Sequence, residues 1–288
     1  MSIYKYPEAK KLQLQLYDQK LKECNIHYEE IYVDTYAGKT YVVITGQNEN
    51  PPLLVLHGIH AGAPLALEAI KGLRHNFRIY AIDTIGQATK TDETPLSVKG
   101  NEYAKWLAEI MEKLHLPKAS IIGVSYGAFI LQNLMVYFPE FVEKAFFVVP
   151  AGFAKGDFFS SMKKLTLPLL QFLIFKKETM LLQFMDAFYT SINDYSVSFQ
   201  KNILLGVKMD FNQPPILRKE QVQNFTPAVF IMVAEDDIFF PGKQSVEKCQ
   251  SILSNFKEFH ILKNTKHIPG PNTYPEIENK LQEWLGAE

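Results

Sequence analysis

The chain has 288 residues, of which 47% are hydrophobic, and its formal net charge is -1. A chain of this length can bury about three quarters of the surface that its unfolded form exposes, which is enough for one catalytic domain. The balanced charge excludes the basic footprint of a nucleic-acid-binding protein. Only two cysteines occur, Cys24 and Cys249, and no CxxC or HExxH spacing is present, so we expect no metal and no other cofactor.

The N-terminal 20 residues lack the continuous apolar core of a secretion signal, because lysines interrupt the leucines. We therefore expect this segment to stay in the mature protein and the protein to be cytoplasmic. Neither glycine nor a second proline follows Pro7 before Cys24, which favours a helix between these residues. We expect this helix to pack on the outside of the domain.

Two β-prone runs, 28–34 and 40–45, flank Ala37-Gly38 and predict an antiparallel hairpin. Six further runs have the apolar, β-branched composition of strands: 53–56, 78–82, 120–124, 145–149, 229–233 and 256–262. Helical segments lie between most of them. The pattern predicts an α/β fold with a doubly wound, mostly parallel sheet and an antiparallel N-terminal edge hairpin.

The run 53–56 leads into the sequence His57-Gly58-Ile59-His60. Glycine lets the backbone turn there, so that the amide of Ile59 points over the end of the sheet. We interpret His57 as a structural hydrogen-bonding residue at the strand end. His60 is a candidate for facing a substrate pocket.

A second turn, Gly123-Val124-Ser125-Tyr126-Gly127, joins a strand directly to a helix. Such a turn forces the serine into a strained conformation and raises its hydroxyl above the sheet edge. Ser125 is therefore the candidate nucleophile. The Ile59 and Tyr126 amides would together form a two-donor oxyanion hole. The pattern alone is common, so a bystander serine in a glycine-rich turn is the alternative interpretation.

Residues 152–225 interrupt the alternation of strands and helices and are rich in phenylalanine, leucine and methionine. Charged residues break every apolar run there before it reaches membrane-spanning length. This segment is either an ordinary helical layer or a helical cap over Ser125, and we favour the cap because of its position. Phe184 and Phe188, which we place one helical turn apart, are its candidate pocket residues. Residues 1–151 and 226–288 would form the core domain.

Three carboxylates, Glu235, Asp236 and Asp237, follow the apolar strand 229–233. We choose Asp237 as the catalytic acid because its spacing from Pro241 turns the chain across the strand end. His267 follows the strand 256–262 and a polar loop, a position that places an imidazole over the sheet edge. His267 is thus the candidate base that removes the Ser125 proton, with Asp237 orienting it.

The order serine, acid, histidine is that of one serine-hydrolase architecture. Through these motifs the sequence resembles the α/β-hydrolase superfamily from about Tyr28 onward, and among its members it looks most like bacterial esterase-type serine hydrolases. It lacks the glycine triplet of lipases and the H-G-G-P-G of proline iminopeptidases. It also has serine where dehalogenases and epoxide hydrolases have aspartate.

The resemblance and the residues together predict a hydrolase that cleaves a carboxylic ester, or a related small acyl substrate, through an acyl-enzyme on Ser125. Carbon–carbon bond hydrolysis and acyl transfer could use the same machinery. A catalytically silent protein that binds a small ligand is the alternative from another class. The sequence does not indicate the substrate or the oligomeric state.

Overall fold

The computed structural model describes residues 2–208, 210 and 212–286, without the side chains of residues 158 and 160. Eight strands form one sheet in the order β1-β2-β4-β3-β5-β6-β7-β8. Strand β2 pairs antiparallel with β1 and β4, and all other neighbours are parallel. The strands are β1 Glu29–Thr35, β2 Gly38–Thr45, β3 Pro52–Leu56, β4 Arg78–Ile82, β5 Ala119–Val124, β6 Val142–Val148, β7 Ala228–Ala234 and β8 Phe256–Leu262. The predicted mostly parallel sheet with its antiparallel edge hairpin is confirmed.

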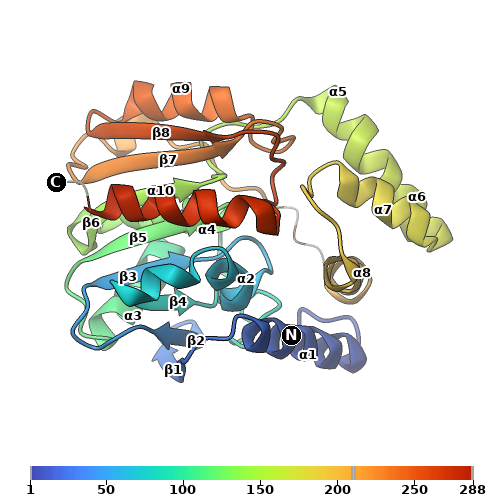
Figure 1. Ribbon diagram of the computed structural model, residues 1–288, viewed down its shortest axis with the longest axis horizontal. Helices are drawn as coiled ribbons and strands as arrows, with labels where there is room; N and C mark the ends of the chain where they lie inside the picture. Colours follow the sequence, from blue (N-terminus) through green and yellow to red (C-terminus); the bar gives the residue numbers. More distant parts are fainter. Residues whose placement is uncertain (1, 209, 211, 287–288) are drawn as a thin grey trace.

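Helices cover both faces of this sheet (Figure 1). The α-helices are α1 Pro7–Glu23, α2 Gly62–Glu68, α3 Glu102–Lys113, α4 Tyr126–Tyr137, α5 Phe158–Ser161, α6 Leu167–Phe175, α7 Glu178–Asp186, α8 Asp194–Gly206, α9 Gly242–Ile252 and α10 Tyr274–Gly286. Short turns complete the chain: η1 Lys71–His75, η2 Pro139–Phe141, η3 Met162–Thr166, η4 Lys219–Gln221 and η5 Pro271–Thr273. Helices α3, α4 and α9 pack on one face, and α1, α2 and α10 pack on the other.

The central strands are apolar throughout because both of their faces are buried. In β3, Leu54 and Leu56 join the core under α3 and α4, whereas Leu53 and Val55 join the core under α2 and α10. This alternation follows from the two-residue period of a strand. The carboxyl ends of the parallel strands all reach the same edge, which faces helices α5 to α8 (Figure 1).

Helices α5 to α8 belong to the segment 152–225 between β6 and β7, which we call the helical insert. The insert has an apolar cluster of its own, which includes buried side chains of η3, α6 and α7: Leu165, Phe172, Leu181, Phe184 and Met185. The insert lies beside the edge of the sheet, and all eight strands of the sheet come from the core (Figure 1).

Helix α1 lies at the periphery of the molecule (Figure 1), and it packs against the insert as well as against the core. Tyr4 pairs antiparallel with Val207, directly after α8. A Cβ on Gly206 would lie 2.4 Å from the Ala9 Cβ, so the two helices touch closely. The side chain of the buried Asn202 donates a hydrogen bond to the Ala9 carbonyl at 3.0 Å. The N-terminal helix therefore joins the core to the insert.

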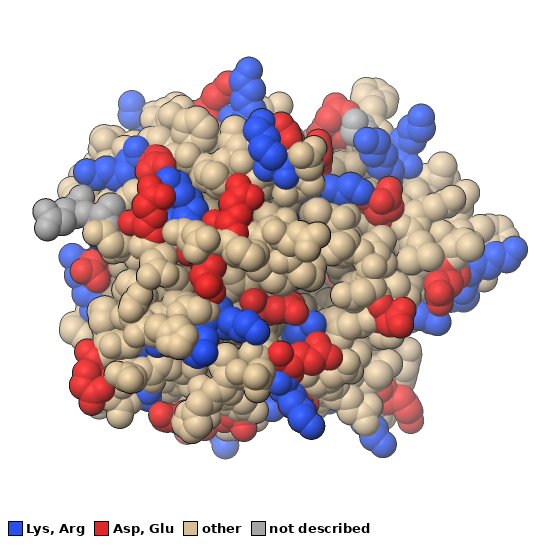
Figure 2. Space-filling view, viewed as in Figure 1, with Lys and Arg blue, Asp and Glu red and all other residues tan. Residues whose placement is uncertain are grey.

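Charged side chains of both signs are interspersed over the face in Figure 2, with no large area of one sign. Within the described ranges, no helix combines the length and the apolar character needed to cross a bilayer.

Candidate active site

Ser125 lies at the turn from β5 into α4, with φ 49° and ψ -110°. A positive φ is strained for a residue with a Cβ, and it is typical of a nucleophile held on a sharp strand-to-helix turn. Gly123 and Gly127, two residues before and two residues after the serine, have no room for a side chain. A Cβ on Gly123 would lie 2.7 Å from the Ala128 Cα, and one on Gly127 would lie 2.2 Å from the Leu56 carbonyl oxygen.

The structure brings His267 to this serine, although 142 positions separate the two residues in the chain. The His267 Nε2 atom lies 2.9 Å from the Ser125 Oγ atom. The next residue, Ile268, donates a backbone hydrogen bond to the carbonyl of Phe188 at 2.8 Å. The loop that carries the histidine is thus hydrogen-bonded to the insert.

Asp237 completes the arrangement from the end of β7. Its Oδ2 atom lies 2.7 Å from the His267 Nδ1 atom. Its Oδ1 atom accepts hydrogen bonds from the amides of Phe239 and Phe240 at 2.8 and 2.9 Å. These bonds hold the buried carboxylate in one orientation, with its second oxygen toward the histidine. The two phenylalanine rings also contact the imidazole edge to face, with centroids 5.1 and 5.3 Å away.

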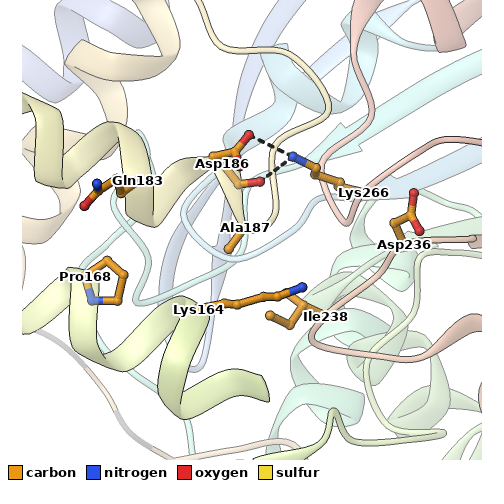
Figure 3. A pocket seen from close by; sticks show the side chains of 8 residues that line it. All are labelled: Lys164, Pro168, Gln183, Asp186, Ala187, Asp236, Ile238 and Lys266. Carbon is orange, nitrogen blue, oxygen red and sulfur yellow. Dashed lines mark hydrogen bonds and ion pairs between the residues drawn. The ribbon is translucent and has the colours of Figure 1, made fainter. Parts of the chain in front are cut away.

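The two other candidate acids lie elsewhere. Glu235 forms an ion pair with Lys263 at 2.7 Å. Asp236 lines a separate cavity of about 390 Å³ between the insert and the loop after β7. Figure 3 shows Asp236 in this cavity beside Lys266, which is bonded to Asp186 of α7. Of the three carboxylates, only Asp237 contacts His267.

Two backbone amides are available next to Ser125. Among the described residues, the amides of Ile59 and Tyr126 have no hydrogen-bond acceptor, and both residues line the same cavity as Ser125. Gly58 lies next to the serine, since a Cβ on it would be in van der Waals contact with the Ser125 Cβ at 3.4 Å. Free amides at this place can receive an anionic oxygen.

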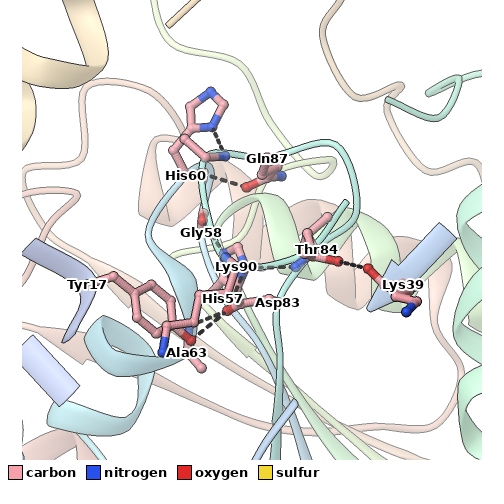
Figure 4. A network of polar contacts seen from close by, with 12 residues as sticks. Tyr17, Lys39, His57, Gly58, His60, Ala63, Asp83, Thr84, Gln87 and Lys90 are labelled. Atoms are coloured by element: carbon pink, nitrogen blue, oxygen red, sulfur yellow. Dashed lines mark hydrogen bonds and ion pairs between the residues drawn. The ribbon is translucent and has the colours of Figure 1, made fainter. Parts of the chain in front are cut away.

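A buried polar network supports the turn that carries Ile59 (Figure 4). His57 donates from Nδ1 to the Gly58 carbonyl at 2.6 Å and accepts the Thr84 amide at Nε2, at 2.9 Å. These bonds require the neutral imidazole, and burial lowers the pKa of His57 accordingly. Asp83 accepts the amide of Ala63 at 2.8 Å. The structural interpretation of His57 agrees with these bonds.

His60 has a positive φ of 57° and lines the cavity beside Ser125. Its Nδ1 atom accepts the Ala88 amide at 3.1 Å, and its own amide donates to the Gln87 side chain at 2.6 Å. Desolvation, together with the neighbouring His57, lowers the pKa of His60 to about 4. The ring is therefore neutral at physiological pH.

The cavity above Ser125 has a volume of about 700 Å³ and is lined mostly by apolar side chains. This size and lining are typical of a small-molecule site. Phe184 and Phe188 both contribute to it, with ring centroids 5.0 Å apart. Helix α7 ends at Asp186, so Phe188 lies beyond the helix on which we expected it.

Sequence reasoning missed a polar part of the cavity wall. Lys20 of α1 lines the cavity and forms an ion pair with Glu68 of α2 at 3.0 Å. Its ammonium group also lies 4.3 Å from the ring centroid of Tyr195. No local signal marks Lys20, because it is one of several lysines in an ordinary helical pattern. Phe239 and Phe240 could have been found from the sequence, since they lie two and three residues after the candidate acid.

Fold and site together define a class of protein, and comparison with known proteins agrees with it. Residues 51–270 match the family model described as alpha/beta hydrolase fold. The chain therefore belongs to the alpha/beta hydrolase family.

Relatives within this family include bacterial carboxylesterases. The chain is 22% identical over 287 residues to an uncharacterized carboxylesterase, nap, of Bacillus subtilis, which covers 95% of this chain and 92% of the relative. It is 32% identical over 137 residues to carboxylesterase YbfK of the same species, about half of each chain. The crystal structure of naproxen esterase from Bacillus subtilis superimposes with a TM-score of 0.84 at 20% identity, covering 98% and 100% of the two chains. At this identity the structural likeness shows the fold.

Proposed function

We propose that the protein is a serine hydrolase that cleaves carboxylic esters. The observation that carries this proposal is the continuous hydrogen-bonded series from Ser125 through His267 to Asp237, with distances of 2.9 and 2.7 Å. The series opens into a mostly apolar cavity and lies beside two free amides. The carboxylesterase names of the relatives support the same activity.

In the proposed reaction, His267 takes the Ser125 proton while the serine oxygen attacks the ester carbonyl. The amides of Ile59 and Tyr126 hold the resulting oxyanion, and Asp237 stabilises the imidazolium. The imidazolium then protonates the leaving alcohol, and an acyl-enzyme remains on Ser125. Water attacks this acyl group with His267 as the base, which releases the acid and restores the serine.

We further propose that the helical insert acts as a cap that selects the acyl substrate. Phe184 and Phe188 of the insert line the cavity, whereas all three members of the proposed triad come from the core. Such a division lets the chemistry stay constant while the insert sets the shape of the pocket.

The central test is covalent labelling with a fluorophosphonate. Ser125 should be modified, as identified by peptide mass spectrometry, and Ser125→Ala should lose labelling and about four to six orders of magnitude in kcat on p-nitrophenyl esters. Thermal unfolding of the variant serves as the control for folding. Modification of another serine would contradict the proposal.

A further inference from the structure

Helices α5 and α6 carry a row of exposed apolar side chains on the outside of the insert. The row, which we call the apolar stripe, consists of Phe159, Met162, Leu167, Leu170 and Ile174, with exposed fractions from 44% to 79%. Single apolar residues on a surface are normal, but a contiguous group of large ones marks an interaction site. Figure 1 shows α5 and α6 on the outer side of the insert, away from the sheet.

A π turn keeps these side chains on one face. The amide of Leu167 bonds to the carbonyl of Met162, five residues earlier, so these two residues lie one turn apart. Phe159 precedes Met162 by three residues. Leu170 follows Leu167 by three residues, and Ile174 follows Leu170 by four, which are the spacings of one helix face. In a regular α-helix without the π turn, the five side chains would spread over a wider arc of about 140°.

The opposite face of α6 is already occupied. Phe172 is fully buried in the apolar cluster of the insert, and Leu169 packs against that cluster and lines the catalytic cavity. Leu170 and Ile174 do not line the cavity. Helix α6 is thus apolar on all sides, a composition normally found only where a helix is buried all round. The stripe is the side of these helices with the highest solvent exposure.

Basic side chains flank the stripe, and acidic ones are absent from it. Lys163 lies in the π turn, and Lys176 and Lys177 follow α6. Lys164 reaches instead into the cavity beside Ile238 and Asp236 (Figure 3). Residues 158–177 contain no aspartate and no glutamate, and Asp157 and Glu178 stand at the two ends of this range. Among the described residues, no carboxylate lies within 4.0 Å of the ammonium groups of the three flanking lysines. In Figure 2 the surface over α6 is largely uncharged, with side chains of both signs at its edges.

We propose that α5 and α6 dock on the surface of an anionic phospholipid bilayer. Helices α5 and α6 would lie in the plane of the headgroups, with the apolar stripe toward the acyl chains and Lys163, Lys176 and Lys177 near the phosphates. A second copy of this chain fits less well, because symmetric pairing of the stripe would bring the lysines of both copies together, and residues 158–177 themselves supply no acidic partner. The surface charge therefore favours an anionic lipid over self-association.

The test is co-sedimentation of the purified chain with vesicles of phosphatidylcholine alone or with one quarter phosphatidylglycerol. We expect binding to the anionic vesicles and its loss at high salt, because counterions screen the lysines. Lys163→Gln with Lys177→Gln should weaken partitioning roughly 25-fold, about fivefold for each lysine. Leu170→Asn with Ile174→Asn should weaken it at least tenfold, since the inserted apolar surface is lost.

Matched controls separate the stripe from general surface effects. Lys243→Gln with Lys257→Gln removes two exposed lysines elsewhere, and Phe259→Asn removes an exposed aromatic side chain from β8. These variants should bind the anionic vesicles like the wild type. Circular dichroism and the hydrolysis of a short, soluble ester should be unchanged in all of the variants.

Three results would overturn the proposal: no binding to anionic vesicles, equal binding to neutral and anionic vesicles, or equal losses in the control variants. Light scattering that finds a dimer, dissociated by Leu170→Asn with Ile174→Asn, would assign the stripe to self-association instead. Binding is measured without substrate. Its failure is therefore distinct from a failure of the proposed esterase activity.

Discussion

The carboxylate of Asp237 accepts hydrogen bonds in an arrangement that neither Glu235 nor Asp236 shares. Two consecutive amides hold one of its oxygens, and the other oxygen faces His267. Asp236 instead lines the cavity on the side of the insert, with its carboxylate away from the imidazole. The chain thus offers two adjacent aspartates, of which one is a natural control for the other.

We expect Asp237→Asn to lower kcat on p-nitrophenyl esters by about 10⁴-fold, because an amide favours the wrong tautomer of His267. Asp236→Asn should stay within a few-fold of the wild type. Steady-state kinetics on the two variants, with unfolding temperatures measured in parallel, check this assignment. Comparable losses at equal stability would show that the geometry does not separate the two residues.

His60 should make stability depend on pH. Its pKa is lowered to about 4 in the folded protein, below its ordinary value of about 6.5. Between these values the unfolded chain binds the proton and the folded chain does not, so stability falls as the pH falls. His60 stays partly open to solvent, and we expect it to contribute about 1–3 kcal/mol to this loss.

His60→Asn keeps a polar side chain that tolerates the positive φ and removes the titrating group. Urea unfolding of both proteins at pH 7 and pH 4.5 gives the test. The variant should lose less stability than the wild type over this interval. A parallel loss in both proteins would mean that His60 does not titrate as proposed.

At the scale of elements, the contact between α1 and α8 is unusually close. Asn202 is buried and donates to both the Ala9 carbonyl and the Gln13 side chain at 3.0 Å. Lys5 and Lys208 extend the contact through backbone bonds at 2.8 Å, to Gly206 and Ile3 respectively. The wall of the cavity formed by α8 is therefore fixed by the N-terminal helix.

The variant Gly206→Ala tests this contact, because the contact decides whether the free energy of unfolding rises or falls. In an exposed helix the change would stabilise by about 0.5–1 kcal/mol. Here the new Cβ would meet the Ala9 Cβ at 2.4 Å, so we expect destabilisation by about 1–3 kcal/mol. Ser198→Ala, at an exposed position of the same helix, is the matched control and should be near neutral. Adding Ala9→Gly should restore part of the unfolding free energy; a stabilised single variant would contradict the close packing.

At the scale of the whole molecule, the proposed cap should alter selectivity and leave the chemistry intact. Phe184→Leu opens the cavity without touching the triad, whereas Phe188 contacts Phe239 next to His267. We expect the ratio of kcat/KM between long and short acyl chains to change tens-fold, since each methylene is worth about 1–3 kcal/mol. The rate of fluorophosphonate labelling, the control, should stay nearly constant. Parallel losses of labelling and ester hydrolysis in a folded variant would make Phe184 part of the catalytic apparatus.

Most of the fold could be predicted from the sequence because its signals are local. A pattern of only a few residues predicts each of these features: the apolar strands, the hairpin around Gly38 and the turn at Ser125. The contact of Gly206 with Ala9 could not be predicted, because nothing in either helix indicates its partner. Lys20 in the cavity wall was missed for the same reason. The bonds from Ser125 to His267 and from His267 to Asp237 are tertiary contacts, and their catalytic role remains a prediction.

The contact between α1 and α8 also affects how the chain folds during its synthesis. The bond from Asn202 to Ala9 spans 193 positions. At 5–20 residues per second, a ribosome needs about 10–40 s to deliver the second partner after the first. Throughout that interval Ala9 and Leu16 of α1 lack their neighbours Phe199 and Ile203 of α8. Helix α1 therefore completes its packing only after α8 has been synthesised, and nascent chains should depend on chaperones in this window.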